Sequence, residues 1–256
     1  LAICVMAVSV VSYGQSSRTP FTFAWLSDVH LNSFAYAEDD LRQSIEDINA
    51  NPAVDFAILS GDVTEFGDTK EFLLLQEILK NFLKPYLLLP GNHDVNWSEN
   101  GCTMFNKIFK ASHFCYDWQG VRFIGCGAGP SLRMGPPHIP REEILWLDSI
   151  IRATPREQPI IFVNHFPLNQ DLSNWYEVTD ILKTRNVLVA LAGHLHVNRA
   201  YDAEGIPAVI GRSSLRRKDP IGGYNLVTVG KDSITFCERI IKTETRPAWN
   251  VVRLHA

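Results

Sequence analysis

The chain has 256 residues, of which 46% are hydrophobic and 20% are charged, and its formal net charge is −4. This composition is typical of a soluble globular protein and excludes the collagen-like, short-repeat and disordered classes. A protein that binds nucleic acid by neutralising phosphates is usually basic, so the acidic balance argues against a stable nucleic-acid partner.

The N-terminal segment 1–14 is apolar and uncharged, and it is too short to cross a bilayer as a helix. Ser12 and Gly14 have the small side chains of a signal-peptidase site, with cleavage after Gly14. Because the chain starts at Leu1 without a basic segment, we expect this signal peptide to be truncated. We expect an exported protein, periplasmic or secreted, from a bacterium. An apolar N-terminal strand is the alternative. We expect no transmembrane segment in the rest of the chain.

The first 90 residues alternate between strand-like and helix-like segments. Short apolar runs bounded by turn residues predict strands at Phe21–Ser27, Phe56–Ser60 and Tyr86–Leu89. Apolar residues at helical spacing predict helices at Glu38–Asn49 and Glu71–Phe82. This order of strands and helices indicates a parallel sheet with helices packed on its faces.

The alternation resumes after a loop-rich stretch and then changes character. The expected elements are a strand at Val121–Cys126, a Pro- and Gly-rich loop at 127–140, a helix at Arg141–Arg152, a strand at Ile160–Asn164, a helix at Glu177–Thr184 and a strand at Val187–Ala192. Four short strands follow at Val197–Tyr201, Ala208–Ile210, Tyr224–Val229 and Ile234–Arg239, which predicts an antiparallel portion. We expect one domain over 20–241. Residues 242–256 have no assigned role and are either a tail or the start of a further segment.

Four cysteines lie outside the N-terminal segment: Cys102, Cys115, Cys126 and Cys237. None belongs to a Cys-x-x-Cys pair, which argues against a structural zinc knuckle. Export would permit a disulfide, and Cys102 with Cys115 is the nearest pair. Spacing does not fix the connectivity, and buried free thiols are the alternative.

Asp, Asn and His side chains follow the predicted strands, at the point where each strand ends. The first three strands run into Asp28 and His30, into Asp62, and into Asn92, His93 and Asp94, and two later strands run into His165 and into His194 and His196. Ligands of open α/β sheets bind at the carboxyl ends of the strands. We therefore expect these nine side chains to meet at one edge of the fold.

Five of the eight histidines are in this set, and packing explains one such histidine more easily than five. Imidazole and carboxylate together suit Zn, Mn or Fe, whereas an oxygen-only Mg or Ca site would not need so many histidines. Alternation along an extended segment would place the two ligands of each Asp-x-His or His-x-His pair on one side. Glycines precede Asp62, Asn92 and His194, and we expect them to let the chain turn sharply.

The blocks Asp28-Val-His30, Gly61-Asp62, Gly91-Asn-His-Asp94, His165 and Gly193-His-Leu-His196 resemble, in order, those of the calcineurin-like metallophosphoesterase superfamily. The resemblance covers roughly residues 21–240. It implies an α/β fold, a four-layer α/β/β/α sandwich of two mixed β-sheets flanked by helices, with a dinuclear metal site at the sheet edge.

The resemblance also implies a role for each residue. Asp28, His30, Asp62 and His196 would hold one metal ion, and Asp62, Asn92, His165 and His194 would hold the other, with Asp62 bridging. His93 would stand over the substrate phosphate and would be oriented by Asp94.

The activity implied is phosphoester hydrolysis, in which a hydroxide bridging two metal ions attacks phosphorus while His93 stabilises charge or protonates the leaving group. The ions are divalent or trivalent (Mn, Fe or Zn), and the pair is left open. A small phosphodiester is the first choice of substrate. The alternatives are a phosphomonoesterase with the same centre and a catalytically silent metal-binding module of a larger surface protein. The oligomeric state is left open.

Residues outside these blocks offer further substrate contacts. Trp97 could stack on a substrate or serve packing, and Arg133 and His138 on the loop 127–140 could meet phosphate or stay solvated. A basic cluster in Gly211–Pro220 could attract an anion or be a solvated loop. It consists of Arg212, Arg216, Arg217 and Lys218.

Overall fold

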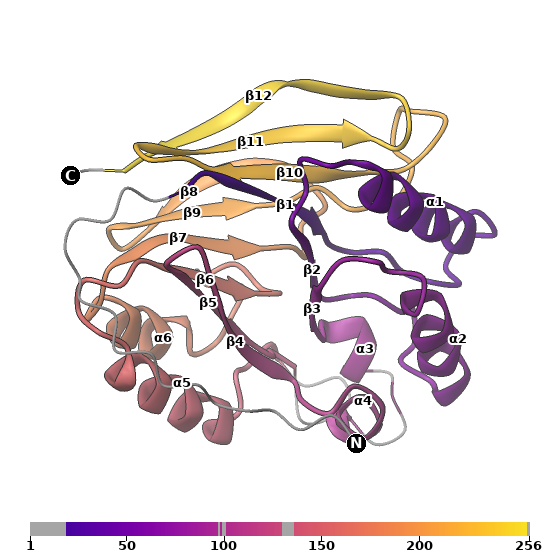
Figure 1. Ribbon diagram of the computed structural model, residues 1–256. Coiled ribbons are helices and arrows are strands. Elements are labelled where there is room, and N and C mark those ends of the chain that lie inside the picture. The colour runs from indigo at the N-terminus through magenta and orange to yellow at the C-terminus, as the bar shows by residue number, and fades with distance from the viewer. Residues whose placement is uncertain (1–18, 97, 99–100, 130–135, 255–256) are drawn as a thin grey trace.

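The computed structural model describes residues 19–96, 98, 101–129 and 136–254. In that part of the chain, two six-stranded sheets stack face to face and helices cover their outer faces, as Figure 1 shows. This is the expected four-layer sandwich of two mixed sheets.

The first sheet combines the parallel strands of the N-terminal half with the antiparallel strands of the C-terminal end. In spatial order it contains β12 (Glu244–Arg253), β11 (Ser233–Ile240), β10 (Gly223–Val229), β1 (Phe21–Leu26), β2 (Phe56–Ser60) and β3 (Tyr86–Leu89). β1, β2 and β3 run parallel, and β10 pairs antiparallel with β1. Its outer face is covered by α1 (Ala37–Ala50) and α2 (Thr69–Leu79).

The second sheet is also mixed. In spatial order it contains β4 (His113–Trp118), β5 (Val121–Cys126), β6 (Ile160–Asn164), β7 (Val187–Ala192), β9 (Ile206–Ile210) and β8 (Arg199–Ala203). β5, β6, β7 and β9 are parallel, and the two edge strands are antiparallel to their neighbours. α5 (Arg141–Ala153) and α6 (Trp175–Leu182) cover its outer face.

The central strands are apolar on both faces because each face meets a different core. On β1, Phe23 and Trp25 pack between the sheets, whereas Ala24 and Leu26 pack under α1 and α2. Strands buried on both sides lose the polar alternation of a half-exposed strand and read as continuous apolar runs. Such strands hold their carboxyl ends rigidly, and these ends carry the candidate site.

The loop-rich stretch after β3 contains structure that the sequence analysis did not predict. α3 (Asn92–Asn96) and α4 (Cys102–Phe109) lie there, and α4 packs on α2 with the rings of Phe105 and Phe72 5.8 Å apart. α2 begins at Thr69, two residues before its expected start, because the Asp68 carboxylate caps it by accepting a hydrogen bond from the Glu71 backbone N–H (2.8 Å).

The C-terminal residues do not form a separate tail. Residues 244–253 form β12, which pairs with β11 through most of its length, so the domain continues past the boundary expected at residue 241. β12 is an exposed edge strand with charged residues and Pro247 in its run. These features protect an edge against further pairing, and they also hide a strand from a pattern search.

Cys115, Cys126 and Cys237 are free thiols, which favours the free-thiol alternative for these three. The side chain of Cys102 and the N-terminal segment lie outside the described residues. Within the described residues, no helix is long and apolar enough to cross a membrane.

Candidate metal centre

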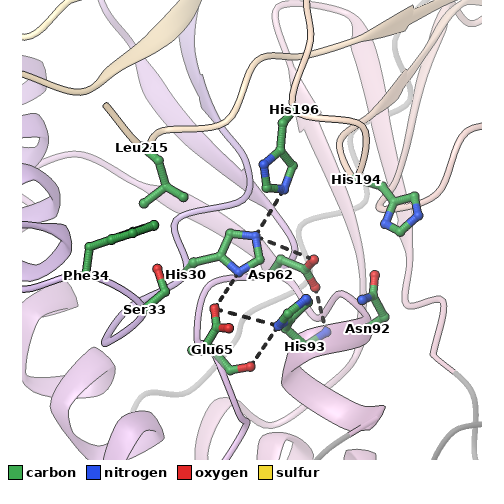
Figure 2. A pocket seen from close by; sticks show the side chains of 10 residues that line it. All are labelled: His30, Ser33, Phe34, Asp62, Glu65, Asn92, His93, His194, His196 and Leu215. Atoms are coloured by element: carbon green, nitrogen blue, oxygen red, sulfur yellow. Dashed lines mark hydrogen bonds and ion pairs between the residues drawn. The ribbon is translucent and has the colours of Figure 1, made fainter. Parts of the chain in front are cut away.

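The predicted ligands meet where strands of both sheets end. Asp28 and His30 follow β1, Asp62 follows β2, Asn92 opens α3 after β3, His165 follows β6, and His194 and His196 follow β7. Figure 2 shows His30, Asp62, Asn92, His194 and His196 around one pocket. The structure therefore brings together all seven candidate metal ligands, as the strand order predicts.

Most of these ligands leave their strands in a left-handed backbone conformation. φ is positive at Asp28 (52°), His30 (49°), Asp62 (49°), His194 (68°) and His196 (55°). Such values are uncommon outside glycine, and Asp and His are among the residues that tolerate them best. The expected alternation along extended segments is therefore wrong, because tight turns aim the side chains. Strain of this kind persists where surrounding contacts fix it, and it clusters at functional sites.

The glycines before these ligands serve two purposes. Gly61 has φ +102°, so it makes the sharp turn that was expected. Gly91 and Gly193 instead provide space, because a Cβ on Gly91 would collide with Asp62 and one on Gly193 would collide with Ser27 and Asp28. The backbone of these two glycines lies against the ligands themselves.

One group of ligands surrounds a point beside β1. The Nε2 atoms of His30 and His196 lie 3.1 Å apart, and His196 Nε2 lies 3.3 Å from Asp28 Oδ1. Asp62 Oδ2 lies 3.9 Å from His30 Nε2. These are the four residues expected to hold the first ion.

A second group surrounds His165, which is fully buried. Its Nδ1 lies 2.9 Å from the Ser60 carbonyl oxygen, so Nδ1–H donates there and Nε2 faces the centre. Nε2 lies 3.1 Å from Asp62 Oδ2 and 3.2 Å from Asn92 Oδ1. A nitrogen of His194 lies within 4.8 Å of the ligand atoms of Asp62 and His165. These are the residues expected to hold the second ion, and Asp62 belongs to both groups.

The donor set fits two cations. Imidazole nitrogens and carboxylate and amide oxygens face one another at the base of an open pocket, and such groups attract a positive charge between them. Burial alone would lower the pKa of His165, but Asp62 and Asp28 outweigh it and raise that pKa to about 9. Burial alone would raise the pKa of Asp62, yet His165 and His30 hold it well below its ordinary value. The electrostatics thus favour a cation at the point where a metal would sit.

Glu65 supports the site and was missed by the sequence analysis. Its carboxylate lies 2.9 Å from His30 Nδ1, which fixes the ring so that Nε2 faces the centre. Its carbonyl oxygen lies 2.8 Å from His93 Nδ1. Carboxylates and carbonyls that hold the second nitrogen of a ligating histidine are a general feature of metal sites.

Asp94 does not orient His93 as expected. Its fully buried carboxylate accepts hydrogen bonds from the backbone N–H groups of Val63 (3.2 Å), Thr64 (2.9 Å) and Gly91 (2.8 Å) and from the Thr64 hydroxyl (2.6 Å). Burial, together with the charge of Asp62, raises the pKa of Asp94 to about 6. Asp94 therefore ties the loop after β2 to the start of α3, while Glu65 positions the His93 ring.

The site opens into a pocket of about 390 Å³, within the range of ~300–1,000 Å³ that is usual for small-molecule sites. Its described lining residues are His30, Ser33, Phe34, Asp62, Glu65, Asn92, His93, His194, His196 and Leu215. Two suggested substrate contacts, Trp97 and Arg133, lie outside the described residues. His138 is not part of this lining, and its Nδ1 lies 3.1 Å from the Ser173 hydroxyl.

The basic cluster is divided between structural and exposed side chains. Arg212 is buried and pairs with Glu238, and Arg216 pairs through two nitrogens with Asp40, at 2.8 Å each. Arg217 and Lys218 are exposed. The idea that the whole cluster attracts substrate is therefore wrong for Arg212 and Arg216, which hold the fold together.

Comparisons with known proteins agree with the fold and with the order of the sequence blocks. The family model of the calcineurin-like phosphoesterases matches residues 21–198. A "probable glycerophosphodiester phosphodiesterase" of Arcobacter nitrofigilis is 26% identical over 204 residues, covering 67% of this chain and 70% of the relative. A 3′,5′-cyclic adenosine monophosphate phosphodiesterase of Haemophilus influenzae is 22% identical over 242 residues, covering 88% and 77%. The structure of a dimetal phosphatase from Danio rerio superimposes with a TM-score of 0.70 at 13% identity, covering 91% and 98%.

Proposed function

Because the chain belongs to the calcineurin-like phosphoesterase family and is a metal-dependent phosphoester hydrolase, we propose that its substrates are small phosphodiesters. One ion would be held by Asp28, His30, Asp62 and His196 and the other by Asp62, Asn92, His165 and His194. Bound ions supply Lewis acidity, which neutralises phosphoryl charge and makes water a stronger acid.

We propose that His93 assists the reaction without binding a metal ion. The Glu65 carbonyl accepts a hydrogen bond from Nδ1–H, and Nε2 of the imidazolium form, which carries both protons, would donate to a phosphoryl or leaving-group oxygen. The backbone N–H of His93 donates to Asp62 Oδ1 at 2.7 Å, which couples the position of this histidine to the carboxylate shared by both groups. Proton transfer by a positioned histidine contributes roughly 10²–10⁴-fold to a rate.

We choose a diester over a monoester because of the charge of the pocket. Among the described residues that line it, none is Lys or Arg. A phosphomonoester carries a charge of about −1.5 to −2 at neutral pH, and sites for such groups commonly add Arg or Lys to the metals. A diester carries a single negative charge and needs no such addition. The two bacterial relatives are named as diesterases, which supports the same choice.

The test is a pair of substrates with the same leaving group. We expect the metal-loaded protein to hydrolyse bis-p-nitrophenyl phosphate with a kcat/KM at least ten times that for p-nitrophenyl phosphate. A preference for the monoester would overturn the proposal and favour a phosphomonoesterase. Two bound ions without turnover of either substrate would also overturn it, and would favour the silent metal-binding module.

Export is a separate proposal that rests on the sequence of residues 1–14 alone. We propose that this segment is a signal peptide that directs the protein to the periplasm or the medium. Expression in a bacterial host with an initiating Met and a basic segment placed before Leu1, followed by mass measurement of the exported chain, tests it, with cleavage after Gly14 expected. A full-length chain retained in the cytoplasm would contradict it.

A further inference from the structure

The pocket has an apolar side that the hydrolytic chemistry does not use. Phe34 and Leu215 line it together with the candidate ligands, and the Phe34 side chain is 51% exposed. Figure 2 shows both on the side of His30 that lies away from His194 and Asn92. A large exposed ring inside a pocket whose lining, apart from Phe34 and Leu215, is polar is available to a ligand.

Phe34 is held in place by a series of stacked groups. Its ring lies parallel to that of Tyr36, with an interplanar angle of 3° and centroids 5.1 Å apart. The Arg216 guanidinium lies 4.5 Å from the centroid of the Tyr36 ring. Arg216 is fixed in turn by its two hydrogen bonds to the buried Asp40 carboxylate. A ring supported in this way loses little freedom when a ligand stacks on it.

The backbone connects this ring tightly to the metal ligands. Phe34 comes four residues after His30, and the turn between them is closed by a hydrogen bond from the Ser33 N–H to the His30 carbonyl (2.9 Å). The Ala37 N–H donates to the Phe34 carbonyl (3.0 Å) at the start of α1. The ring therefore has a fixed place relative to His30, from which it can reach a group joined to a phosphate at the centre.

We propose that Phe34 is a specificity-determining residue that stacks on a planar aromatic group, such as a nucleobase, joined to the phosphoryl group of the substrate. This inference rests on the proposed function only in placing the phosphoryl group at the metal ligands. Stacking of a base on an aromatic side chain is worth about 5- to 150-fold in affinity. The substrate class is thus a phosphodiester of a nucleoside-like alcohol rather than of glycerol alone.

The experiment compares two probes that differ only in the base. Binding of the methyl diesters of adenosine 5′-monophosphate and of ribose 5-phosphate is measured by calorimetry on the metal-loaded His93→Ala variant, in which turnover is suppressed. We expect the nucleotide to bind about 5- to 150-fold more tightly. Adding Phe34→Leu, which keeps an apolar side chain but removes the ring, should bring the ratio of the two affinities close to one. Adding Phe34→Trp instead should keep or increase it.

Phe66→Ala is the matched control, since Phe66 is a comparably exposed aromatic (55%) that is not among the described residues lining the pocket. This variant should keep the ratio. Equal affinity for the two probes before any change at Phe34, or no binding of either, would overturn the inference. So would an unchanged ratio in Phe34→Leu. Failure of the proposed function would appear separately, as absent hydrolysis of bis-p-nitrophenyl phosphate by the protein with His93 intact.

Discussion

His93 is positioned by Asp62 and Glu65, which follow β2, rather than by its neighbour Asp94. The Glu65 carbonyl engages its Nδ1, and its own N–H reaches Asp62. The two contacts separate the role of the side chain from that of the backbone. A substitution at this position can remove the imidazole and keep the N–H that holds the bridging carboxylate.

Changing His93 to Ala should therefore lower kcat for bis-p-nitrophenyl phosphate by roughly 10²–10⁴-fold while two ions stay bound. Steady-state kinetics and elemental analysis of the same preparation measure both quantities. Metal content that falls in step with kcat would show that the side chain holds an ion instead of assisting the reaction.

The sequence suffices to predict the ligand candidates because each directly follows a strand. Position at the end of a strand determines which edge a residue occupies, so His165 and His194 could be placed near Asp62 across more than 100 residues. The role of Glu65 could not be predicted, because it depends on how the loop after β2 folds back beneath His30 and His93. For the same reason, the contacts of Asp94 with Val63, Thr64 and Gly91 differ from the role that the resemblance implied for it.

The loop between β9 and β10 is joined to α1 through Asp40, whose carboxylate accepts hydrogen bonds from Arg216 and from the Gly222 backbone N–H (3.0 Å). Arg216 contacts Asp40 and Tyr36 at once, so it links this loop to the N-terminal turn of α1. Asp40 is only 4% exposed, and removal of Arg216 would leave its carboxylate without that partner. The pair thus supports the segment that carries Phe34.

Arg216→Ala should lower the free energy of unfolding by about 1–3 kcal/mol, less than the full cost of an unpaired buried charge because the arginine is partly exposed. The matched variant Arg217→Ala removes an exposed charge from the same loop and should change stability by less than about 0.5 kcal/mol. Urea unfolding of the two variants under one condition measures the difference. Equal effects would mean that the pair with Asp40 contributes nothing.

Strands with continuous apolar runs were predicted well, and the two strands that were missed lie at sheet edges. β1, β2 and β6 are short apolar runs and lie close to their expected ranges. β4 and β12 are edge strands with polar, partly exposed faces, so their patterns resemble loops. Their structure comes from pairing with a neighbour, and local sequence carries little of that information.

For the whole molecule, the centre links stability to pH and to metal. The carboxylates raise the pKa of His165 to about 9, and the hydrogen bond to Asp28 raises that of His196. A histidine whose folded pKa exceeds its ordinary value of 6.5 binds its proton more tightly in the folded state. Its stabilising contribution is complete below that ordinary value and is lost as the pH rises towards 9.

The metal-free protein should therefore lose about 1–3 kcal/mol of unfolding free energy between pH 6.5 and pH 9. The metal-loaded protein should not show this loss, because ligation requires neutral histidines. Urea unfolding of both forms across the interval measures it, and a metal-free His165→Asn variant should show a shallower slope. A metal-free stability that is constant or rises with pH would contradict the assignment of positive charge to His165.

A metal titration of stripped protein, with bound ions and turnover of bis-p-nitrophenyl phosphate read from the same aliquots, tests whether two ions at this centre perform the hydrolysis. We expect two ions per chain, turnover that appears as the second ion is taken up, and fewer than two ions in an Asp62→Asn variant that has lost the shared carboxylate. Turnover that does not depend on bound ions, or a protein that takes up none, would contradict it.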